Sequence, residues 1–171
     1  MARLSLWFGR LLDLLMAVAC LLLLTMTVMI GIDVLFRNIG AGGLAVSNEL
    51  SEDILYLITL LAAPWLLRQG QHIRVDILLR ALPLRLAWAL EWVGDIVGLV
   101  CSLYFVWYGV LITKASYAAG SINIKTLVTP EWWTLVPLPL AFSLVALEFF
   151  FRMHRLASSE IGLRDDAISA A

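Results

Sequence analysis

Long apolar runs separated by short polar segments make up most of the chain. Four of these runs contain no Asp, Glu, Lys or Arg, and they are Leu14–Ile32, Ile54–Leu67, Ile96–Thr113 and Trp132–Leu147. A helix of about 20 apolar residues crosses the roughly 30 Å hydrocarbon core of a bilayer. The pattern therefore predicts an all-α membrane protein with four transmembrane helices, at about residues 11–35, 49–68, 88–113 and 131–151.

The second run is the shortest, and the segment after it is unusually polar. The run crosses the bilayer only if Asp53 and Arg68 lie at the two interfaces, where the long stem of Arg68 lets its charge reach the headgroups. The polar stretch "RQGQHIRVD" follows at 68–76, and beyond it apolar residues alternate with arginines. Asp76 and Arg80 stand four residues apart, in the favourable order for a helical ion pair. We expect a short amphipathic helix at about 73–82, lying in the interface between spans two and three.

The start of the fourth span carries a helix-initiation signal, "TPEWW". Thr129 is expected to cap the helix, Pro130 to take its first position, and Glu131 to face the positive end of its dipole. Pro137 and Pro139 should bend this helix, which neighbouring membrane helices tolerate.

The positive charges are distributed unequally between the connections. With a cytoplasmic N-terminus, nine of the 12 lysines and arginines fall on the inner side, while only Arg37, Lys114 and Lys125 fall outside. Positive charge accumulates on the cytoplasmic side of membrane proteins. We therefore expect both termini in the cytoplasm, with a four-helix transmembrane domain at 1–155 and a mobile tail at 156–171. We expect the apolar run after Arg3 and Arg10 to be retained as the first span and not cleaved as a signal peptide.

Composition agrees with a protein whose solvent is lipid. Mean hydropathy is +0.93, and 15% of residues are charged, against about 25% in soluble domains. The net charge of −1 gives no sign of a nucleic-acid partner. Cys20 and Cys101 fall inside apolar runs, so we interpret them as small buried residues.

Catalytic chemistry is not expected. Ionisable groups at membrane depth are usually functional, yet here they lie near the span ends, where Arg10 can pair with Asp13, Arg37 with Asp33, and Arg152 with Glu148. Asp53 is the exception, because its span is so short. His72 and His154 both lie near the cytoplasmic boundary, which does not suit haem ligation between helices. The sequence predicts no enzyme, no metal site and no cofactor.

Small residues recur at three- and four-residue spacing on three spans. Span three carries Gly94, Gly98 and Ser102, with Glu91 and Asp95 on roughly the same face. The other stripes are Ala17, Cys20, Thr27 and Gly31 in span one, and Glu49, Glu52, Tyr56, Thr59 and Ala63 in span two. Such spacing lets helices approach closely. Packing within the chain is one interpretation of each stripe, and helices of another protein are the other.

The chain resembles the small four-helix membrane subunit (DctQ type) of the tripartite ATP-independent periplasmic, or TRAP, transporters. The resemblance rests on "DVLFRN", on Glu49, on "LLRQGQHIRVDILLRALP" and on "TPEWWTLVPLPLAF". The third segment is the most specific, since Arg68, Gly70, His72 and the "IRVD" that follows match the family pattern. Leu57, Ala62 and Pro64 depart from it, which affects the packing of span two and not the assignment.

The resemblance implies a function that the residues alone do not give. In this family a large multispan subunit moves the substrate, driven by a sodium gradient, and a soluble periplasmic binding protein delivers it. The substrate is usually an organic acid. The small subunit has no substrate site; it braces the large subunit in the bacterial inner membrane.

Candidate interface residues follow from these interpretations. Contacts with the large subunit or with membrane lipid are expected at Arg37, Glu49, Glu52, Tyr56, Arg68, His72, Asp76, Gly94, Gly98 and Ser102. Lys114 and Lys125 are candidates for contact with the binding protein. Two alternatives remain: a self-contained homodimeric transporter that uses Asp53, and an anchoring subunit of another membrane complex.

Overall fold

The computed structural model describes residues 2–40, 42–69, 84–124 and 126–158. The amphipathic helix expected at 73–82 lies outside these ranges, together with His72, Asp76 and Lys125. Residues 159–171 of the expected tail also lie outside them.

Helices make up almost all of the described chain. The long helices are α1 (Ala2–Asn38), α2 (Ser47–Arg68), α4 (Leu84–Ala119) and α6 (Pro137–Ser158). A two-stranded antiparallel hairpin, β1 (Ile122–Ile124) and β2 (Val128–Pro130), and the short α5 (Glu131–Leu135) join α4 to α6. Four stretches are long and apolar enough to span a membrane: Leu6–Asn38, Ser47–Arg68, Trp88–Ala119 and Glu131–Ala157. The prediction of an all-α protein with four such helices is confirmed, apart from the small hairpin.

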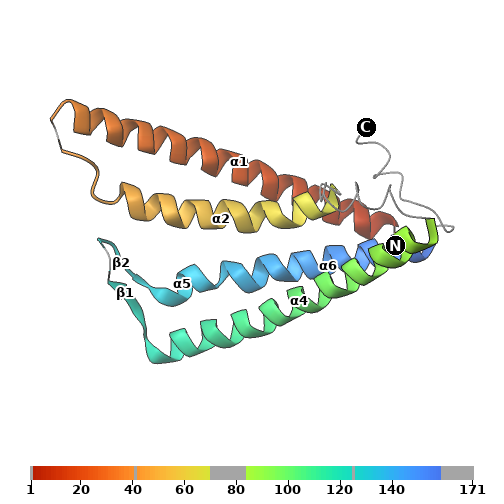
Figure 1. The fold of residues 1–171 in the computed structure, drawn as a ribbon. Coiled ribbons are helices and arrows are strands. Elements are labelled where there is room, and N and C mark those ends of the chain that lie inside the picture. Colours follow the sequence, from red (N-terminus) through yellow and green to blue (C-terminus); the bar gives the residue numbers. More distant parts are fainter. Residues whose placement is uncertain (1, 41, 70–83, 125, 159–171) are drawn as a thin grey trace.

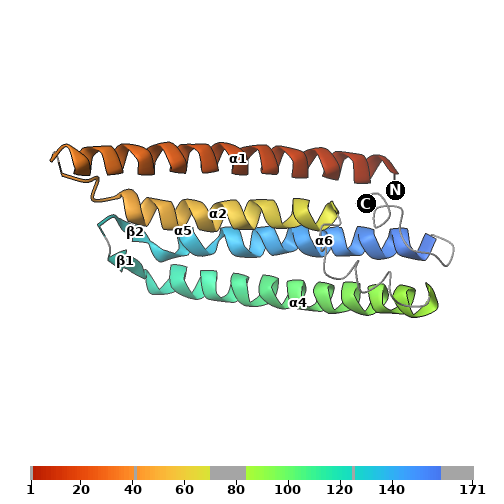
Figure 2. The same cartoon turned by 45° about the horizontal axis from the view of Figure 1, so that its top comes forward.

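The four long helices lie side by side in the order α1, α2, α6, α4 (Figure 1). Helix α1 packs on α2, α2 on α6, and α6 on α4, and the same order is visible after rotation (Figure 2). The α1–α2 connection and the hairpin lie at one end of this layer, and the start of α1 and the end of α6 lie at the other (Figure 1). Following the predicted orientation, we call these the outer end and the inner end.

The edge helix α1 faces α2 through one narrow stripe. The stripe consists of buried or half-buried residues at alternating spacings of three and four: Leu12, Leu15, Ala19, Leu22, Met26, Met29 and Asp33. This is the spacing at which two helices interlock at a shallow angle. In the most apolar stretch of α1, 6% is buried, whereas in the most apolar stretch of the span Glu131–Ala157, which contains α6, 22% is buried. Most of the α1 surface is therefore open to lipid or to another protein.

The other edge helix, α4, packs closely on α6 through glycine. A Cβ at Gly98 would overlap the ring of Phe149, and one at Gly109 would approach Leu138 and Pro139. Further along, the rings of Phe105 and Phe142 stack with centroids 4.6 Å apart. The face of α4 that carries Gly98 and Gly109 therefore belongs to the interior of this chain.

The start of the fourth span differs in detail from the prediction. Helix α5 begins at Glu131, and Pro130 is the cap residue, with φ −62° and ψ 129° and no side-chain capping bond. Thr129 does not cap the helix because it lies in β2, paired with Asn123. At the position of the predicted bend the helix is interrupted: α5 ends at Leu135 and α6 begins at Pro137, whose missing N–H removes one bond of the helical ladder.

A cluster of buried ion pairs ties the helices together at the inner end. Glu148 of α6 is fully buried, and it pairs with Arg155 at 2.6 Å and with Arg68 of α2 at 3.5 Å. The Arg68 guanidinium also lies against Gly9 of α1. Asp95 of α4, which is 2% exposed, pairs with Arg152 of α6 at 3.0 Å. Through these pairs, α6 is linked to the helices on both of its sides.

Two ion-pair expectations change in this cluster. Arg152 pairs with Asp95 and not with Glu148, because Arg155, seven residues beyond Glu148, reaches back to it. Asp13 accepts a hydrogen bond of 3.0 Å from Trp65 Nε1 of α2, while Arg10 lies over the ring of Trp7. Sequence spacing within one helix did not reveal partners on the neighbouring helix.

We expect Gly98→Leu to destabilise the protein by about 1–3 kcal/mol, because the added side chain would displace the Phe149 ring from a filled interior. The measurement is the temperature at which the detergent-extracted protein loses its size-exclusion peak. Gly94→Leu is the matched control, since nothing lies within 4 Å of a Cβ at Gly94. Equal losses for the two variants would contradict the packing described for α4.

Glu148→Gln should destabilise the protein more than Gly98→Leu does, by about 3–5 kcal/mol, because a buried ion pair that loses one partner leaves uncompensated charge. Two arginines would then face a neutral amide. The same melting measurement applies. Asp13→Asn serves as the control, because the amide oxygen can still accept the bond from Trp65; a Glu148→Gln protein as stable as this control would argue against the cluster.

Candidate functional site

The outer end of α1 is held to the following connection by a carboxylate. Arg37 Nη2 lies 2.9 Å from Asp33 Oδ2, and Asp33 Oδ1 accepts a 2.5 Å hydrogen bond from the backbone N–H of Leu44. Gly40 and Gly42 turn the chain here with φ of 73° and 78°, a conformation that glycine adopts readily. The predicted Asp33–Arg37 pair is present, and the Arg37 side chain remains 55% exposed.

Glu49, which the sequence placed at a partner interface, has a role within the chain. Its carboxylate accepts hydrogen bonds from the backbone N–H groups of Thr126, at 2.6 Å, and Leu127, at 3.1 Å. Both donors belong to the turn of the hairpin, far from Glu49 in sequence. Glu49 therefore fixes the hairpin against the start of α2.

A second carboxylate supports the base of the hairpin. Ser116 Oγ lies 3.0 Å from Glu131 Oε2, and the Glu131 N–H donates to the Ser121 carbonyl at 3.0 Å. This hairpin was not predicted from the sequence. Its signal was the β-branched residues of "INI" and "VTP", with Gly120, which has a positive φ, just before them.

The hairpin presents apolar side chains outward. Ile124 is 81% exposed and Val128 is 65% exposed. Lys114, a candidate for contact with the binding protein, is exposed on the last part of α4. The outer end thus offers a fixed surface with apolar and basic groups together.

The small-residue stripes divide into inward and outward sets. Gly98 and Ser102 face α6: Ser102 is buried, and its hydroxyl donates to the Gly98 carbonyl at 2.7 Å. Gly94 is exposed, with open space around it. On α1 the whole stripe faces outward, opposite the surface that packs on α2; it consists of Ala17, Cys20, Thr27 and Gly31, all exposed.

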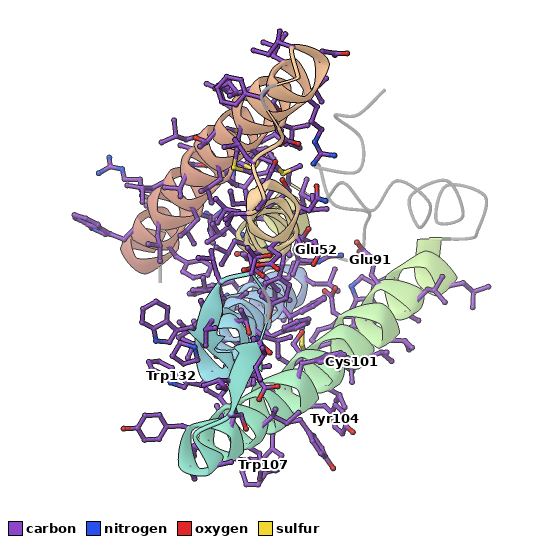
Figure 3. All side chains as sticks on the ribbon, turned by 90° about the vertical axis from the view of Figure 1, so that its left-hand side faces the viewer. Glu52, Glu91, Cys101, Tyr104, Trp107 and Trp132 are labelled. Carbon is purple, nitrogen blue, oxygen red and sulfur yellow. The ribbon has the colours of Figure 1, made fainter. Side chains whose placement is uncertain are left out.

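Cys20 and Cys101 are both exposed free thiols, so the prediction that they are buried is wrong. Each lies on an edge helix with a large open surface. An apolar run shows that a residue avoids water, but it does not distinguish the protein interior from lipid. The open surface of α4 also carries Tyr104 and Trp107, whose rings point away from the other helices (Figure 3).

The span-two stripe is also divided. Glu52 and Thr59 are exposed, and Tyr56 is half-buried. Tyr56 lines a pocket of about 150 Å³ at the outer end, between α2 and the α5–α6 segment. The other lining residues are Asp53, Leu57, Thr129, Trp133, Thr134 and Pro137. Arg68, expected to meet a lipid phosphate or a carboxylate, meets the Glu148 carboxylate.

Among the residues that the structure describes, no three His, Cys, Asp or Glu side chains lie close enough together to hold a metal ion. What the described residues do provide is open helical surface within the membrane and a fixed surface outside it. Such an arrangement is suited to association with other proteins.

Comparison with known proteins agrees with this description. The chain matches no curated protein significantly. The family model of the DctQ component of tripartite ATP-independent periplasmic transporters matches residues 26–158, which is most of the chain and includes α2, α4, the hairpin, α5 and α6. Transport systems of this family combine such a component with a large membrane subunit and a periplasmic binding protein. This chain, a multi-pass protein of the bacterial inner membrane, belongs to the DctQ family and is a small subunit of a TRAP transporter.

Proposed function

We propose that this subunit braces the large membrane subunit of a sodium-coupled transporter for organic acids, and that the outward stripe of α1 is the main contact. The observation that carries the proposal is the position of Ala17, Cys20, Thr27 and Gly31. They are small, spaced by three, seven and four residues so that they share one side of the helix, and directed away from α2. Within lipid, close packing of small residues is a principal source of helix association.

The assignment to α1, in preference to α4, follows from the glycines. The space beside Gly98 and Gly109 of α4 is filled by α6 side chains, and the open Gly94 lies between the exposed Val93 and Val97. Nothing lies within 4 Å of a Cβ at Gly31 of α1, which belongs to a stripe of exposed small residues. Large aromatic and aliphatic side chains dominate the open surface of α4, as Trp107 at 71% and Val100 at 60% exposure illustrate. Those side chains suit lipid, while the α1 stripe suits the backbone of another helix.

Substrate transport itself would belong to the large subunit. In the described residues the charged groups lie toward the helix ends, and the buried acids Glu148 and Asp95 are committed to arginines. Sodium and organic-acid binding are therefore proposed for the partner. Of the remaining candidates, Arg37 and Glu52 are exposed contacts for the large subunit or lipid, and His72 and Asp76 stay proposals.

Gly31→Leu should reduce recovery of the large subunit by about fivefold or more, because overpacking an interface costs about 1–3 kcal/mol. The measurement is mild-detergent purification of the tagged chain from native membranes, followed by quantitative mass spectrometry of both subunits. Gly94→Leu, which adds the same side chain to an open position on α4, is the control. Loss only in Gly94→Leu would place the interface on α4, and recovery of a homodimer without the large subunit would overturn the scaffold role.

Charge reversal at Lys114 and Lys125 tests contact with the binding protein. We expect the double variant to Glu to require more binding protein for half-maximal uptake, with the rate at saturating binding protein unchanged, since charges at the rim of an interface act mainly on association rates. The double variant to Arg keeps both charges and should behave as wild type. An unchanged requirement in the Glu variant would remove these lysines from the interface.

A further inference from the structure

The pocket lined by Asp53 is placed and shaped for a small group with an apolar stem. Its volume of about 150 Å³ equals that of a cavity which accepts benzene. Trp133, 60% exposed, lines it on the outer side, and Leu57 and Pro137 supply apolar walls. Exposed tryptophans are typical of the headgroup level of a membrane, so the pocket lies just below that level.

Asp53 differs from the other described carboxylates of the helices. Six of them have a hydrogen bond or ion pair described above: Asp13, Asp33, Glu49, Asp95, Glu131 and Glu148. Glu52 and Glu91 have interactions as well. Asp53 is half-buried, and in the ranges that the structure describes it has neither a hydrogen bond nor an ion pair. A carboxylate at this depth is costly unless a cation accompanies it.

The remaining polar groups of the pocket include several that can accept hydrogen bonds. The Thr134 hydroxyl donates to the Glu131 carbonyl at 2.7 Å, which leaves only its lone pairs for a ligand. Pro137 has no N–H, so the Trp133 carbonyl lacks its regular helical donor. Tyr56 and Thr129 add hydroxyl oxygens. A group that carries several N–H donors and a positive charge matches this set, and a primary ammonium has three.

An apolar strip continues from the pocket along α6. Leu140 and Leu147 are 62% and 47% exposed, and their spacing places them on the side of the helix that includes Pro137. A carboxylate at the top of an exposed apolar strip is complementary to an amphiphile with a cationic head. A lysine from another protein would use the pocket but not the strip.

We propose that this pocket binds the primary ammonium headgroup of an aminophospholipid, such as phosphatidylethanolamine, from the outer leaflet. Asp53 pairs with the ammonium, the Trp133 carbonyl and the hydroxyl oxygens accept its remaining N–H groups, and an acyl chain lies along Leu140 and Leu147. The lipid thereby neutralises an acid that the described protein does not neutralise.

The test measures, by native mass spectrometry, the lipid that stays bound to the complex of this chain and its large subunit after purification from nanodiscs. Two lipid compositions are compared. One set of nanodiscs contains phosphatidylethanolamine and phosphatidylglycerol, and the other contains phosphatidylcholine and phosphatidylglycerol. We expect Asp53→Asn to lower the amount of retained phosphatidylethanolamine about tenfold, because the variant loses a charge-assisted hydrogen bond to the ammonium. Asp13→Asn, which removes an exposed carboxylate charge at the inner end, far from the pocket, should retain it. Phosphatidylcholine, which has no ammonium N–H, should not be retained by any variant.

Equal retention of phosphatidylethanolamine in wild type and Asp53→Asn would overturn the proposal, and so would equal retention of phosphatidylcholine by the wild type. If Asp53→Asn instead released the large subunit and left lipid retention per complex unchanged, a basic side chain of that subunit would occupy the pocket. Recovery of the large subunit with the wild-type chain is measured in the same preparations. Failure of the bracing role is therefore distinguishable from failure of the lipid site.

Discussion

The ion pairs of Glu148 are the interaction on which the layer of helices depends. Lipid is as apolar as the side chains that it surrounds, so helices in a bilayer gain little from apolar contact alone. Glu148 is completely buried and pairs with arginines of α2 and α6, and Asp95 forms the equivalent link from α4. Because Arg68 also contacts Gly9, this one region connects all four long helices.

The outer end is ordered by a different use of carboxylates. Asp33 and Glu49 accept hydrogen bonds from backbone N–H groups of the connections, at Leu44 and at Thr126 and Leu127. An acid that binds backbone amides fixes the path of a loop, whereas an acid that binds arginine fixes two helices. Glu49 and Glu148 therefore complement one another: one sets the outer surface, and the other sets the order of the helices beneath it.

The sequence predicted the helices well because charge-free runs report directly on membrane crossing. It did not predict which face of each helix is internal, since Gly31 and Gly98 occur in similar small-residue stripes and only the neighbouring side chains separate them. The same limit explains Cys20 and Cys101. Contacts across helices, such as Trp65 with Asp13, and the hairpin held by Glu49 depend on residues far apart in sequence, which local spacing does not reveal.

The unequal lengths of two neighbouring helices have a consequence for the surrounding bilayer. Helix α1 has 37 residues and α2 has 22, which correspond to about 55 Å and 33 Å. The charge-free part of α2, Ile54–Leu67, extends for only about 21 Å, less than a typical hydrocarbon core of about 30 Å. The charge-free part of α1, Leu14–Ile32, extends for about 28.5 Å and matches that core. Lipid beside α2 must therefore thin, or the layer must tilt, at a cost of fractions of a kcal/mol per Å of mismatch. This subunit therefore favours thinner lipid beside α2 than beside α1, and in the proposed complex the thickness of the bilayer would bias the angle at which α1 meets the large subunit.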